Sequence, residues 1–213
     1  MLLKVLWMLV VMGMLGGCNI VGWLGQAVAP KTKAIFPLAD RPTLILVEDP
    51  QNLFKDPTIA RLIAQRIGDL LLDHHVITTL VPAYSVDELR MNLGEDFVQV
   101  GIDQIGRAVH GEQVVHVHLE SLILYPDPGL LEPTASVQVK VIDAVNRKRI
   151  FPRANSAFAA AGHRVRVKLL SRGADPGDSE TRVAMRKLAA RLVRDCARLF
   201  YAYMPRQPGE PFE

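Results

Sequence analysis

The sequence predicts an α/β fold, in which a single mixed β-sheet carries packed helices and a long amphipathic C-terminal helix. Three observations lead to this class. The first half of the chain alternates strand and helix patterns, in the order strand, helix, strand, helix. A series of three or four alternating strands follows, and one long helical pattern comes after them. Of the 213 residues, 49% are hydrophobic and 22% are charged, which suits one folded domain with tails.

The first strand is expected over 43–47, a continuous apolar run that ends in an acidic loop. Asp56 and Pro57 supply an N-cap and a first-turn proline, which predict a helix over 57–74. A second strand is expected over 76–81. The apolar stripe of the helix consists of Ile59, Leu62, Ile63, Ile67, Leu70 and Leu71.

Two short helices are expected next. Ser85 and Glu88 have the spacing of a capping box, which predicts a helix from there to Asn92. The other is expected over 103–109 and ends at a His-Gly pair.

The remaining elements complete the sheet and its cover. Alternating polar and apolar residues predict strands over 114–124, 135–144, 149–151 and 163–169. The final helix is expected over 180–203, and its apolar side consists of Met185, Leu188, Leu192, Leu199 and Tyr203.

The N-terminus has the pattern of a lipoprotein signal. Lys4 precedes an apolar run over 5–15, whose length fits a signal sequence and falls short of the about 20 residues that a membrane span needs. Residues 15–18, Leu-Gly-Gly-Cys, resemble a lipobox, in which small residues precede a cysteine that receives a lipid. The alternative is an uncleaved signal anchor, because apolar residues continue beyond Cys18.

These features predict the organisation of the chain. We expect a signal peptide over 1–17, a lipidated Cys18 with a flexible tether over 18–40, the α/β domain over 41–204 and a disordered tail over 205–213. The anchor places the protein on a membrane, facing the periplasm. Asn19 after the cysteine favours the outer membrane over the inner one in a Gram-negative cell.

The net charge of +3 is mild, and no nucleic-acid partner is predicted. The two cysteines, Cys18 and Cys196, cannot make a disulfide framework. We expect Cys196 to pack as a small apolar residue.

Segments 44–47, 63–67, 111–117 and above all 137–151 combine strand patterns with an Ile-Asp turn. They resemble the α/β domain shared by the curli-secretion lipoprotein CsgG, the TolB N-terminal domain and related envelope lipoproteins, and they are similar to uncharacterised lipoproteins of planctomycete-type bacteria. The resemblance implies envelope assembly or scaffolding without catalysis. A CsgG-type pore is not expected, because every alternating segment is needed for the core sheet.

Several polar residues are candidates for chemistry. His116 and His118 share one strand face and could bind zinc or copper, with His110 or Glu120 completing the site; the alternative is two polar side chains on a partly solvated face. A carboxylate cluster of Glu48, Asp49 and Asp56 is possible, although a strand exit and an N-cap explain these residues as well. The adjacent pair His74–His75 suits the C-terminal end of a helix.

Two surfaces are candidates for contact with a partner. The last helix carries several arginines, among them Arg186, Arg194 and Arg198, which suit an acidic partner or anionic lipid headgroups. Leu130 and Leu131 lie at a predicted hairpin tip, where they either contact a partner or fold back onto the domain.

The sequence therefore predicts a membrane-anchored, non-catalytic binding or assembly accessory of the cell envelope. No nucleophile, phosphate-loop or triad motif is recognisable, and we expect no enzyme and no cofactor. The expected partners are the membrane, through the lipid, and an envelope protein or a second copy of the chain. The alternative is a lipoprotein that binds a metal or small ligand on the face of His116 and His118.

Overall fold

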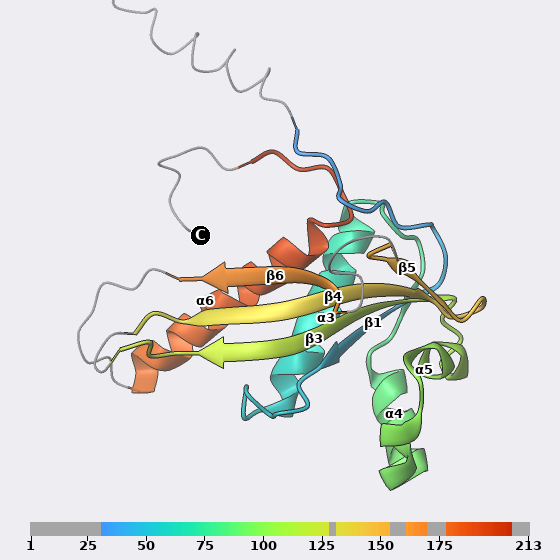
Figure 1. Ribbon diagram of the computed structural model, residues 1–213, viewed down its shortest axis with the longest axis horizontal. Coiled ribbons are helices and arrows are strands. Elements are labelled where there is room, and N and C mark those ends of the chain that lie inside the picture. Colours follow the sequence, from blue (N-terminus) through green and yellow to red (C-terminus); the bar gives the residue numbers. More distant parts are fainter. Residues whose placement is uncertain (1–30, 128–130, 154–160, 170–177, 206–213) are drawn as a thin grey trace, which may run out of the picture. The chain divides into compact units, whose positions relative to one another are not determined.

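The computed structural model describes residues 31–127, 131–153, 161–169 and 178–205 (Figure 1). The chain divides into two compact units. The larger, Ala34–Tyr201, contains the helices and strands that are described. The smaller comprises Met1–Lys33 and Ala202–Glu213, and in its described part Thr32 and Tyr203 exchange two backbone hydrogen bonds of 2.8 and 3.0 Å.

The larger unit has the predicted alternation of strands and helices. Its elements are β1 (Thr43–Glu48), α3 (Pro57–Asp73), β2 (Leu80–Val81), α4 (Tyr84–Leu93), the 3-10 helix η1 (Gly94–Gln99), α5 (Ile102–Ala108), β3 (Gln113–Ile123), β4 (Thr134–Asp143), β5 (Lys148–Phe151), β6 (His163–Lys168) and α6 (Asp178–Ala197). None of the described helices is both long enough and apolar enough to cross a bilayer.

The six described strands form one mixed sheet, which confirms the predicted fold class. Their order is β2-β1-β3-β4-β5, and β6 also pairs with β4. β1 runs parallel to β2 and β3, whereas β3, β5 and β6 run antiparallel to β4. β5 and β6 share one edge of β4, because β5 pairs with 141–143 and β6 with 134–139.

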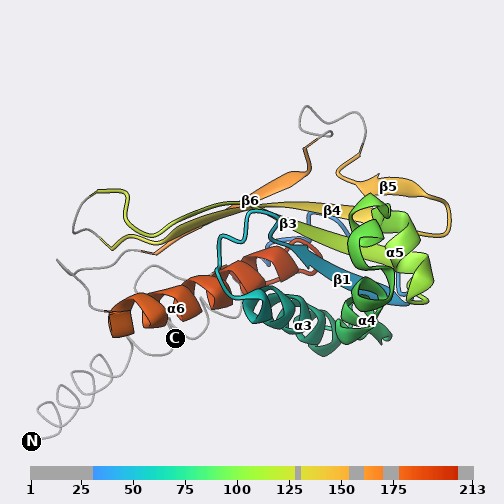
Figure 2. The same cartoon turned by 90° about the horizontal axis from the view of Figure 1, so that it is seen from below.

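One face of the sheet packs against α3 and α6, which lie side by side along it (Figure 2). On α3, Ile63, Ile67 and Leu71 are at most 1% exposed, as the predicted stripe requires. Leu62 is an exception at 50% exposed, because it lies in the helix row of Thr58 and Arg66, which are also exposed. The core on this face also includes Val115, Val117, Leu119, Val137, Val139, Val141, Leu188, Leu192 and Cys196.

The opposite face is covered at one end. There α4, η1 and α5 contribute to a second apolar cluster, which includes Leu44, Leu46, Val86, Phe97, Ile105 and Val114. Farther along β3 and β4, the same face carries polar side chains, and no described helix packs on it. We call this polar part the open face; it is formed by Glu48, His116, His118, Glu120, Gln138, Lys140 and Arg164.

Two predicted elements are shorter than expected. β2 contains only Leu80 and Val81 instead of 76–81, because the chain first turns after α3: the N–H of Val76 donates to Leu71, and Asp40 accepts from Thr78. Helix α6 ends at Ala197 rather than at 203. Beyond it, backbone hydrogen bonds of the i→i−3 type, such as Phe200 N to Ala197 O, tighten the turn.

The predicted start of α4 is also wrong. The N-cap of α4 is Ala83, so Ser85 lies inside the helix and makes no capping hydrogen bond. The segment before β1 belongs to the larger unit from Ala34 on, because Phe36 and Leu38 pack against the core and the N–H of Phe36 donates to Leu199.

Candidate functional site

The open face brings polar residues from four strands into one row. Glu48 of β1 pairs in register with His118 of β3, His118 pairs with Gln138 of β4, and Gln138 pairs with Arg164 of β6. Because side chains alternate between faces along a strand, His116 projects from the same face as His118, as the sequence predicts.

Glu48, His116 and His118 form a compact cluster. Glu48 Oε2 lies 2.7 Å from His116 Nε2 and 3.9 Å from His118 Nδ1. One nitrogen or oxygen atom from each of the three residues lies within 4.8 Å of the others. The side chains of Glu48 and His118 are 32% and 39% exposed, whereas that of His116 is only 5% exposed. The cluster therefore has one buried member and two that solvent can reach.

Glu48 is held in its ionised form. The hydrogen bond with His116 keeps the pKa of Glu48 below its usual value, against the opposing effect of partial burial, and the nearby histidines and Arg90 act in the same direction as that hydrogen bond. His116 Nδ1 is buried and has no hydrogen-bond partner. The ring of His116 is therefore fixed through Nε2, and in its neutral form the ring proton belongs on Nε2, facing Glu48.

Neither residue predicted to complete a histidine site does so. Glu120 accepts hydrogen bonds from Ser136 (3.0 Å), Gln138 (3.0 Å) and Arg164 (2.8 Å), so its oxygens are already engaged. The hydrogen bond from Arg164 is the main reason why the pKa of Glu120 lies below its usual value. His110 follows Val109, the C-cap of α5, and does not belong to the cluster. The third member of the cluster with His116 and His118 is Glu48 instead.

The predicted carboxylate cluster does not form. Asp49 accepts from the backbone N–H groups of Leu53 (2.8 Å) and Phe54 (2.9 Å), which closes the loop after β1. Asp56 accepts from Thr58 N at 2.9 Å and is the N-cap of α3, as its position before Pro57 indicates. The alternative of a strand exit and an N-cap is correct for these two residues.

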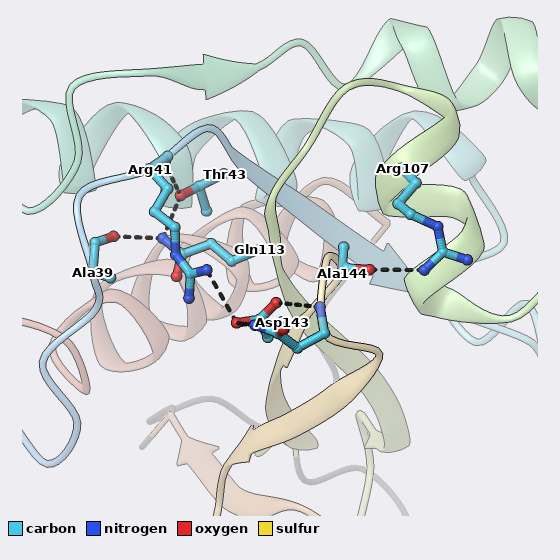
Figure 3. A network of polar contacts seen from close by, with 8 residues as sticks. Ala39, Arg41, Thr43, Arg107, Gln113, Asp143 and Ala144 are labelled. Carbon is cyan, nitrogen blue, oxygen red and sulfur yellow. Dashed lines mark hydrogen bonds and ion pairs between the residues drawn. The ribbon is translucent and has the colours of Figure 1, made fainter.

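A polar network at the start of β1 and β3 supports the strand register (Figure 3). Gln113 Nε2 donates to Ala39 O (2.6 Å) and to Thr43 Oγ1 (2.7 Å), which ties the start of β1 to β3. Arg41 forms an ion pair of 3.0 Å with Asp143, which ties the segment before β1 to the end of β4. These contacts hold β1 in the register that places Glu48 opposite His118.

The histidine pair at the end of α3 is structural. His74 is the C-cap of that helix, as the sequence predicts, and its ring stacks on Tyr201 with 3.8 Å between the ring centroids. This contact joins α3 to the chain beyond α6.

The predicted partner contacts differ in how they are placed. On α6, Arg186 is exposed and Arg194 is half-buried. Arg198, which directly follows the helix, is half-buried and lies 3.6 Å from Asp195. Leu131 is 2% exposed, so it is folded into the domain and offers no surface to a partner. Leu130 and the predicted lipidation site, Cys18, lie outside the described residues.

Cys196 is buried in the core, as predicted, and burial raises the pKa of its thiol. Such a thiol reacts poorly, because the thiolate is the reactive form.

The search of protein-family models and that of curated proteins gave no match. Among solved structures, the chain is similar to lipoprotein GNA1162 from Neisseria meningitidis (TM-score 0.39, 13% identity, covering 72% of this chain and 94% of that one). It is also similar to PelC from Paraburkholderia phytofirmans, a dodecamer (TM-score 0.36, 13% identity, 84% and 99% covered). A third similar structure is the hypothetical protein CT253 from Chlamydia trachomatis (TM-score 0.38, 13% identity, 74% and 98% covered). At this identity the likeness concerns the fold alone.

Proposed function

We propose that the protein is a lipoprotein whose α/β domain acts in the cell envelope as a non-catalytic binding or assembly accessory, held at a membrane by an acylated Cys18. The observation that carries the proposal is the segment 15–18, Leu-Gly-Gly-Cys, placed directly after the apolar run of 5–15. Stable anchoring requires more than one acyl chain, and a triacylated cysteine meets this requirement.

The proposed location is the periplasmic side of a membrane, with the outer membrane favoured in a Gram-negative cell because Asn19 follows the cysteine. The proposed partner is an envelope protein or a second copy of the chain. The resemblance of 137–151 to CsgG-type and TolB-type domains supports a role in assembly. The basic side of α6, with Arg186 exposed and Arg194 half-buried, supports an acidic partner surface.

The anchor is tested by Cys18→Ser in cells that export the full chain and are fed labelled palmitate. We expect the wild-type chain to take up label and to migrate at the mature size, and the variant to do neither. Cys196→Ala is the matched control, because it removes the chain's other cysteine, which is buried, and should remain labelled. Label on the Cys18→Ser variant would show that the lipobox assignment is wrong.

A second candidate function, the binding of a metal or small ligand, is favoured by a separate observation. Glu48 contacts His116 and lies close to His118 on a face that solvent reaches.

A further inference from the structure

We infer that Glu48, His116 and His118 form a binding site for a divalent transition-metal ion of the zinc type. The inference goes beyond the role of a lipid-anchored accessory and does not depend on the anchor. It rests on the identity of the donor atoms, on their spacing and on their access to solvent.

The donor set is selective. Two imidazole nitrogens and one carboxylate oxygen are ligands that zinc uses in sites with an open fourth position, and imidazole also suits copper and nickel. Magnesium and calcium require six or more oxygen ligands, which this cluster does not offer. The chemistry therefore selects a borderline transition metal over the hard cations.

The spacing is close to that of a bound ion. Around a tetrahedral zinc with bonds of about 2.0–2.1 Å, ligand atoms lie about 3.3–3.4 Å apart. The two distances from Glu48 Oε2, 2.7 Å to His116 and 3.9 Å to His118, lie on either side of this value. Shifts of roughly half an ångström at these two contacts would bring Glu48 to the spacing of a tetrahedral site. The two histidine nitrogens, which lie within 4.8 Å of each other, must also approach to that spacing, and side-chain rotation at the half-exposed Glu48 and His118 allows both adjustments.

The surroundings determine how tightly the ion is held. Binding at Nε2 moves the ring proton of His116 to the buried Nδ1, which has no acceptor, and this lowers the affinity about ten-fold to hundred-fold relative to a site with a satisfied second nitrogen. Lys140 pairs in register with His116, and Arg90 acts on the charge of Glu48; both positive charges weaken the attraction for a cation. We therefore expect a moderate-affinity site whose fourth position faces solvent.

The inference is tested with zinc alone on the purified full-length protein in detergent, by equilibrium dialysis and metal analysis. The expected result is one zinc bound per chain, with the affinity lowered at least ten-fold by Glu48→Gln and by His118→Ala. Glu48→Gln is nearly isosteric, and His118 is exposed enough for the fold to tolerate its removal. A urea unfolding curve for each variant establishes that it is folded.

The matched controls are Glu120→Gln, which removes a carboxylate of the same face, and His163→Ala, which removes a half-exposed histidine of β6 outside the cluster. Both should bind zinc as the wild type does. The inference fails if the wild type binds no zinc, if either cluster variant binds it with unchanged affinity, or if the controls lose it equally. Because acylation of Cys18 is measured independently, a negative result here leaves the proposed anchor standing.

Discussion

Asp143 connects the end of β4 to the segment before β1 and to the turn that follows β4. It forms an ion pair of 3.0 Å with Arg41 and accepts hydrogen bonds from Asn146 N (2.8 Å) and Asn146 Nδ2 (3.0 Å). Burial by itself raises the pKa of Asp143, but the hydrogen bonds from Asn146 and Arg41 outweigh it and leave the pKa below its usual value. The folded protein is therefore stabilised by the ionised form.

Asp143→Asn should lower the free energy of unfolding by about 1–3 kcal/mol at pH 7, because a buried acceptor of charge-assisted hydrogen bonds is lost. A urea titration measures this loss. The matched control is Asp69→Asn, which breaks the exposed 3.7 Å pair with Arg66 and should change stability by less than about 0.5 kcal/mol.

The same variant tests the sign of the pH dependence. A carboxyl group with a lowered folded pKa contributes its stability above the unfolded pKa, near 3.9, and loses it as pH falls through the folded pKa. The stability difference between wild type and Asp143→Asn should therefore shrink below about pH 4. An unchanged difference at pH 3 would show that the charge of Asp143 is not responsible.

At the level of single residues, the sequence predicts what depends on local periodicity. The shared face of His116 and His118 follows from their spacing of two, and the N-cap role of Asp56 follows from its position before Pro57. Glu48 joins the histidines through the parallel pairing of β1 with β3. The sequence shows that Glu48 ends the first apolar run. It does not show the register between β1 and β3, which lie far apart in the sequence.

Among the elements, α5 packs closely against β3 and the end of β4 at Gly106. A Cβ atom at Gly106 would lie 2.6 Å from Val114 Cγ2 and 3.0 Å from Ala144 Cβ, and both neighbours are fully buried. Gly68 on α3 is a matched position, where a Cβ would meet Leu80 Cδ2 at 2.5 Å. The difference is that the leucine tip can rotate, whereas valine is stiff at χ1 and alanine has no rotatable tip.

Gly106→Ala should therefore lower the free energy of unfolding by roughly 1–2 kcal/mol, since α5 must move away from β3. In Gly68→Ala, rotation of Leu80 lets the better helix propensity of alanine offset the strain, and the change should stay below about 1 kcal/mol. Thermal unfolding of the two variants side by side gives the comparison. Equal losses would contradict the packing argument.

The elements also show where local signals mislead. Ser85 and Glu88 satisfy the spacing of a capping box, yet the N-cap of α4 is Ala83, two residues before Ser85. The strand pattern of 76–81 is apolar because Ile77 packs in the core from the loop after α3, and only Leu80 and Val81 pair with β1. Burial and strand pairing produce the same apolar signature, and the sequence does not separate them.

For the molecule as a whole, the proposed partner defines a prediction about charge. The full-length chain, crosslinked in native membranes, should yield one defined product, with an envelope protein or with a second copy of itself. Combining Arg186→Glu with Arg194→Glu should reduce that product at least five-fold, because an acidic partner would then be repelled. Lys55→Glu with Lys148→Glu is the control, since it makes the same change in net charge at exposed positions away from α6. A product that survives the α6 variant would exclude this surface.

The order of elements, and with it the fold class, was predictable because apolar residues repeat at one spacing in helices and at another in strands. The pairing of strands was not, since β4 accepts three partners and the histidine cluster depends on β1 lying beside β3. The packing of Phe36 and Leu38 against the core was not predictable either, because they are isolated apolar residues, which carry no periodicity.

The shared edge of β4 makes part of the chain a natural insertion point. The chain leaves the sheet at Phe151 and returns at His163, and each of β5 and β6 takes its register from β4 alone. The register of one strand therefore does not fix that of the other, and doubling the length of a flexible connection costs only about 0.6 kcal/mol of closure entropy. If the N-terminus is occupied by lipid, an epitope or fluorescent reporter spliced between these strands would report on the tethered protein without disturbing its attachment.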